Sequence, residues 1–128
     1  MAGTHSTAFR NTVADAHTTA LGASPKLKFR LSGTVAAPGT AAATLTMSAT
    51  PFGAASGGTS TANAITSDTN ATGNATAVAN ATLETSAGTV VSHWAVAASG
   101  SDINMTGSLT IGAGDTVSCS SLTYSAMP

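Results

Sequence analysis

The chain has 128 residues, the usual size of one domain, with a net charge of −1 and only 7% charged residues. Globular proteins average about 25% charged residues, so this surface lacks the basic footprint that nucleic acid or an anionic membrane requires. We therefore expect neither a nucleic-acid nor a membrane partner. The apolar share of 42% argues against disorder.

Residues 6–21 are predicted to form a helix. An apolar stripe recurs at helical spacing, formed by Phe9, Val13, Ala16 and Ala20. Thr4 or Ser6 can cap the start, and Gly22 suits the position after the end. The stripe is narrow, so residues 1–23 are either a helix packed on the domain or an arm that orders on a neighbouring subunit.

Residues 24–128 are predicted to form a β domain that begins with an alternating strand, residues 26–32. The strand places Leu27, Phe29 and Leu31 on one face, and it places Lys26, Lys28 and Arg30 on the other. These are three of the four cations in the chain.

Further strand-like runs follow at residues 42–48, 62–66, 76–85, 89–96, 102–105, 108–111 and 116–124. The runs at 76–85 and 89–96 read as a hairpin, Phe52 as the anchor of the loop at 51–58, and Ser120-Ser121 as a bulge. Seven or eight short strands behind one helix predict a mainly β fold: an antiparallel β-sandwich or jelly roll.

The sequence contains few residues in patterns that indicate catalysis or metal binding. The three histidines lack metal-binding spacing, and no two of the five carboxylates are close along the chain. Asp68, Asp102 and Asp115 lie in turns, where an aspartate closes an Asx turn, and Cys119 reads as a small buried residue. We therefore expect no enzyme, no cofactor and no metal site.

The basic strip is the one organised polar feature and has two readings. Its cations protect an exposed edge strand, or they contact an acidic patch on a partner. In the second reading Lys26, Lys28 and Arg30 are the contact residues, and Arg10 joins them if the helix packs nearby.

Several segments resemble small virion proteins of tailed bacteriophages and prophages. They are LKFRLSG at residues 27–33, the runs ATLTMSATPFGAASGG and AITSD within residues 43–72, and SGSDINMTGSLTIGAGDTVSCSSLTYSAMP at 99–128. One departure is Trp94, which follows the hairpin turn, where members of that group often carry an aromatic before it. The resemblance implies a structural virion component and supplies no catalytic residue.

The expected function is therefore a non-enzymatic capsid decoration protein on the surface of the phage head. Its expected partners are the major capsid protein and copies of itself, with a trimer as one arrangement. Two alternatives stay open: a tail or head-fibre component with a carbohydrate-binding surface around Trp94 and Tyr124, and a small enzyme or metal-dependent module.

Overall fold

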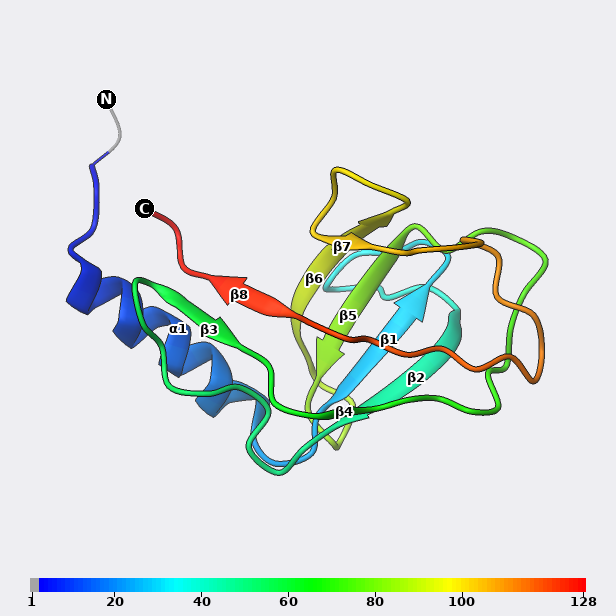
Figure 1. Ribbon diagram of the computed structural model, residues 1–128, viewed down its shortest axis with the longest axis horizontal. Helices are drawn as coiled ribbons and strands as arrows, with labels where there is room; N and C mark the ends of the chain where they lie inside the picture. The colour runs from blue at the N-terminus through cyan, green and yellow to red at the C-terminus, as the bar shows by residue number, and fades with distance from the viewer. Residues whose placement is uncertain (1–2) are drawn as a thin grey trace.

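The computed structural model describes residues 3–128, which form one helix and eight strands (Figure 1). The elements are α1 (Thr7–Leu21), β1 (Lys26–Arg30), β2 (Ala41–Met47), β3 (Thr59–Thr61), β4 (Ile65–Thr66), β5 (Asn80–Glu84), β6 (Val90–Ala97), β7 (Ile103–Asn104) and β8 (Thr123–Ser125). The predicted fold class, mainly β with an N-terminal helix, is confirmed.

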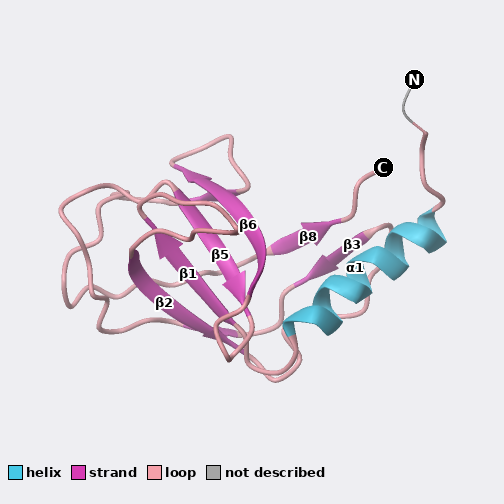
Figure 2. Cartoon of the chain, turned by 180° about the vertical axis from the view of Figure 1, so that it is seen from behind, coloured by secondary structure: helices cyan, strands magenta, loops and turns pink. Residues whose placement is uncertain are grey.

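Six strands form one curled sheet in the order β4-β2-β1-β5-β6-β7. All neighbours are antiparallel except β6 and β7, which run parallel. Strands β3 and β8 make a separate two-stranded ribbon. Helix α1 lies beside this ribbon at one end of the molecule, as the view from behind in Figure 2 shows.

The core lies on one face of the six-stranded sheet. Its buried members there include Leu27, Phe29, Leu45, Leu83 and Trp94. The chain that covers them is mostly extended but irregular, and contributes Val78, Ile111, Val117 and Leu122. The second layer of the sandwich is therefore built from long loops and the β3–β8 ribbon instead of a second regular sheet.

Two strand predictions in the C-terminal segment are wrong. Residues 108–111 form no strand, because Leu109 and Ile111 each accept only one backbone bond, from Val78 and Asn74. Residues 116–124 pair at Val117, which bridges to Asp68, and then only from Leu122 onward, where Leu122 accepts a bond from the Ala62 amide and β8 begins at Thr123. The predicted bulge at 120–121 consequently has no ladder to interrupt.

The predicted helix is present, but its buried face is not the predicted one. Ser6 caps the start by accepting a bond from the Phe9 amide at 3.3 Å. The buried residues are Ala14, His17 and Leu21, whereas Phe9 is 49% exposed. The prediction failed because it followed the apolar stripe, whereas the buried face is set by Ala14, His17 and Leu21 together with hydrogen bonds from polar side chains of the helix.

Those polar contacts join the helix to the loop before β3. Asn11 accepts a bond from the Gly58 amide at 2.7 Å, and Asp15 accepts one from the Ala55 amide at 2.9 Å. Phe52 is 1% exposed in the same region, which confirms the prediction that it anchors its loop.

Candidate functional site

The basic strip lies in the middle of the sheet. Strand β1 is paired on both sides, with β2 and with β5. The edge-protection reading of Lys26, Lys28 and Arg30 is therefore wrong, because an interior strand has no free edge to protect. Leu27 and Phe29 point into the core as predicted, and Leu31 is half-buried.

A buried carboxylate, Glu84 on β5, forms ion pairs with two of the three cations. Its Oε2 lies 2.6 Å from Arg30 Nη2, and its Oε1 lies 3.3 Å from Lys28 Nζ. Thr82 donates to the same carboxylate at 2.8 Å and accepts from Arg30 Nε at 2.9 Å. Arg30 also donates to the Gly39 carbonyl. The group is a closed network within the fold.

Burial alone would raise the pKa of the Glu84 carboxyl. The hydrogen bonds from Arg30 and Thr82 and the charge of Lys28 outweigh that effect, so this pKa lies below its usual value. Glu84 is therefore ionised at neutral pH, and the network carries two cations around one anion.

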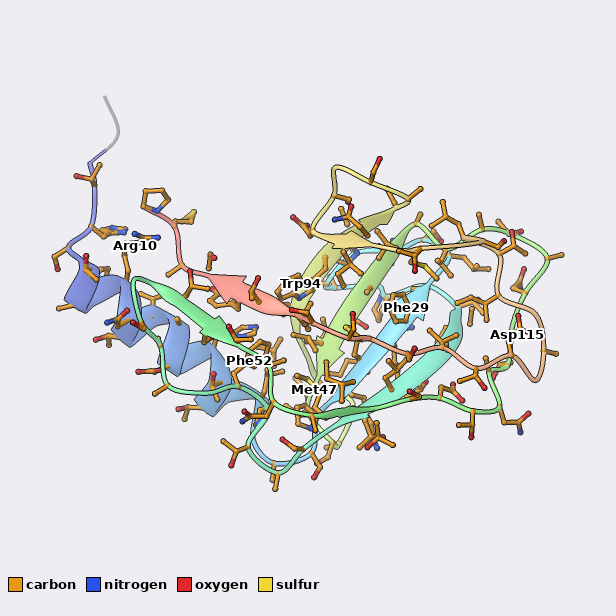
Figure 3. All side chains as sticks on the ribbon, viewed as in Figure 1. Arg10, Phe29, Met47, Phe52, Trp94 and Asp115 are labelled. Atoms are coloured by element: carbon orange, nitrogen blue, oxygen red, sulfur yellow. The ribbon has the colours of Figure 1, made fainter. Side chains whose placement is uncertain are left out.

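Arg10 does not join the strip. Its guanidinium lies at the far end of the molecule, where Nη2 donates to the Ala126 carbonyl at 3.3 Å and the group rests on Gly58 (Figure 3). The four residues predicted as one partner contact thus occupy two separate places. Arg30 is only 8% exposed, while Lys26 and Lys28 are half-buried. Their contact with a partner stays a prediction.

Every charged side chain of the protein is engaged within its own fold. Lys26 donates to Thr46 at 2.9 Å, and Asp68 accepts from the Thr44 and Asn70 amides, the latter in the predicted Asx turn. Asp102 accepts from the Ala95 amide and Asp115 from the Gly112 amide. With the contacts of Arg10, Asp15, Lys28, Arg30 and Glu84 given above, all four cations and all five carboxylates have an internal partner.

An aromatic cluster joins the helix to the sheet. The His17 ring stacks on Tyr124 with centroids 3.9 Å apart and meets the edge of Phe52 at 5.6 Å. Ser92 Oγ lies 3.0 Å from His17 Nε2 and accepts a bond from Trp94 Nε1 at 2.9 Å. Burial lowers the pKa of His17 from 6.5 to about 4, so the ring is neutral at physiological pH.

The buried neutral His17 makes stability depend on pH. The unfolded chain takes up this proton near pH 6.5, whereas the folded protein resists it until about pH 4. The contribution of His17 to the free energy of unfolding is therefore fully present above pH 6.5. It is lost as the pH falls toward 4, and the total loss is about 3 kcal/mol. Urea unfolding measured across that range checks the decline.

Two variants separate His17 from the other groups. His17→Gln should remove most of the decline between pH 6.5 and about 4. His93→Gln, in an exposed histidine on β6, should leave it unchanged. An unaltered decline in His17→Gln would show that other groups cause it.

A groove lies within the second layer. It has a volume of about 590 Å³ and lies between residues 102–110 and residues 115–123, with Phe29 of β1 at its floor. Figure 3 shows Phe29 between these two segments and Asp115 near the turn that joins them. Serine and threonine dominate the lining, and half-buried Cys119 is part of it. Burial raises the pKa of the Cys119 thiol, so this thiol is not activated.

Within the described residues, few side chains of the types that catalyse reactions lie close together. Within residues 3–128, no three His, Cys, Asp or Glu side chains gather in a way that could hold a metal ion. In the same part of the chain, no helix has the length and hydropathy needed to cross a bilayer.

Comparison with known proteins adds no relative. No family model matches the sequence, and neither a curated protein nor a solved structure matches it.

Proposed function

We propose that the protein is a non-enzymatic structural component of a tailed-phage virion and that it decorates the outside of the capsid as a homo-oligomer. The sequence resemblance suggests the virion. The major capsid protein and further copies of this chain are the proposed partners.

The observation that carries the proposal is the internal use of all nine charges. Surface charge on a protein that acts alone keeps copies apart. Here the charged groups hold loops, the helix and β1 in place, and the remaining surface is mostly Thr, Ser and Ala. A surface with so few charges suits a subunit that packs against neighbours, because few charged groups have to lose water at an interface.

The exposed apolar residues support the same proposal. Phe9 is 49% exposed on α1, Val35 is 50% exposed in the loop after β1, and Met127 is 77% exposed near the C-terminus. Phe9 and Met127 lie at the same end, because their neighbours Arg10 and Ala126 are hydrogen-bonded. This end is a candidate for contact between subunits.

The carbohydrate-binding alternative has weaker support. A sugar-binding platform needs an exposed aromatic face. Trp94 is only 8% exposed, and Tyr124 is covered on one side by His17. The enzyme alternative has no favourable observation, because Asp102 and Asp115 already accept backbone hydrogen bonds and the Cys119 thiol is not activated.

Copy number in the virion tests the proposal. Quantitative mass spectrometry of purified particles should find this chain in hundreds of copies per virion, in a fixed ratio to the major capsid protein. A dozen copies or fewer would contradict decoration and point to the tail. Absence from particles of the phage that encodes it would contradict a virion role altogether.

A further inference from the structure

The second layer of the sandwich has a gap where a strand would fit. Residues 103–110 and 116–123 run in opposite directions across the same face of the sheet, and the groove lies between them (Figure 1). The bordering segments are paired in part: β7 pairs with β6, Leu109 accepts a bond from the Val78 amide, and residues 117–123 pair with Asp68, Ala62 and β3.

Both segments that border the groove carry unbonded backbone groups. Within residues 3–128, the backbone N–H and C=O groups of Ser118, Cys119 and Ser120 form no hydrogen bond, and neither does the N–H of Ser121. Across the groove, the Thr106 backbone is also unbonded in this part of the chain. Strand β7 is an edge of the six-stranded sheet. Unpaired strand edges are templates for the addition of another strand.

The groove has the size of a short strand. Strands lie about 4.8 Å apart, sheets pack about 10 Å apart and a strand rises about 3.3 Å per residue, so one strand residue occupies roughly 160 Å³. The volume of about 590 Å³ therefore holds about four residues.

The charge of the groove lining indicates which side chains a bound strand would carry. Its lining contains two carboxylates, Asp102 and Asp115, and no cation. Asp102 precedes β7, and Asp115 lies near the turn at the opposite end (Figure 3). Each uses its Oδ2 to accept a backbone bond, which leaves Oδ1 for a ligand. The floor at Phe29 is apolar.

We propose that this groove binds an extended segment of another polypeptide, added between the two edges by main-chain hydrogen bonds, with a Lys or Arg at each end. The segment is apolar where it faces Phe29 and polar where it faces solvent. A second copy of this chain is a poor source, because its four cations are engaged in its own fold. The proposal does not depend on the virion role.

A model peptide tests the proposal on the full chain. The probe is the capped hexapeptide Lys-Thr-Val-Thr-Val-Lys, whose central residues favour an extended backbone. Amide hydrogen exchange followed by NMR should show that the probe slows exchange at residues 118–121 and at Thr106. A hexapeptide with Glu in place of both Lys, and one N-methylated at alternate residues, should not slow it.

A paired variant tests the charges. Asp102→Asn with Asp115→Asn keeps an acceptor for the Ala95 and Gly112 amides and removes both negative charges. It should weaken binding of the Lys peptide by about tenfold. The fold is checked by the exchange pattern of the sheet, which should not change.

Three outcomes would overturn the proposal. The first is that the Lys peptide slows no amide in the groove, the second is that the N-methylated peptide acts equally well, and the third is that the paired variant binds the Lys peptide unchanged. Protection of residues 118–121 that increases with protein concentration and needs no peptide would instead assign the groove to a second copy.

Discussion

Glu84→Gln is expected to lower the free energy of unfolding by about 3–5 kcal/mol. The substitution leaves Arg30 buried with no anion and removes the partner of Lys28. An uncompensated buried charge is costly because the surrounding protein cannot solvate it as water does. Urea unfolding at neutral pH measures the loss.

Arg30→Met in the Glu84→Gln background is the matched control. It removes the stranded guanidinium, and its long apolar side chain fills much of the same space. The double variant should recover part of the lost stability, because replacing both partners of a buried pair is less damaging than removing one. If the double variant were less stable than Glu84→Gln by the full effect of Arg30→Met alone, the two groups would be independent and the account of the network would be wrong.

Phe52→Ala is the second substitution with a large expected effect, again about 3–5 kcal/mol. Phe52 is 1% exposed and meets the edge of His17, so it joins the loop before β3 to the helix and the sheet. Its loss opens a cavity beside the aromatic cluster. Urea unfolding measures the effect, and NMR titration should show the pKa of His17 rising from about 4 toward 6.5 as water enters.

Phe9→Ala provides the comparison within the same residue type. Phe9 is 49% exposed on the outer face of α1, so its truncation should change stability by less than about 0.5 kcal/mol. A large loss at Phe9 with little loss at Phe52 would mean that the helix packs through the apolar stripe predicted from sequence.

The helix shows what the sequence could and could not predict. Its span follows from Ser6, Gly22 and the absence of glycine and proline between them, all local features. Its orientation depends on polar bonds from Asn11, Asp15 and His17 to residues between 40 and 75 positions away. A helical pattern reports which residues are apolar, but it does not report which polar residues find partners.

The ion-pair partner of the basic strip also could not be predicted from the sequence. Alternation along residues 26–32 correctly places Leu27 and Phe29 in the core. Glu84 lies 54 positions from Arg30, and its pairing with the strip depends on the order of strands in the sheet. Without that order, three cations on one strand face look like a surface feature.

The C-terminal segment departs from its predicted strand for another reason. Val117 and Cys119 alternate as in a strand, and Leu122 and Tyr124 do so with the phase shifted by one, but only Thr123–Ser125 form a strand. Regular pairing also needs a neighbour on the inner side, and the described chain leaves that side open as the groove. The strand-like sequence is consistent with the proposal that another chain completes the layer.

The proposal that this protein decorates the outside of the capsid is tested most directly by its position in a reconstruction of the intact virion. The account predicts that the domain fits density on the outside of the head, repeated over the capsid lattice and in contact with the major capsid protein. Density only in the tail, or none in the particle, would contradict it.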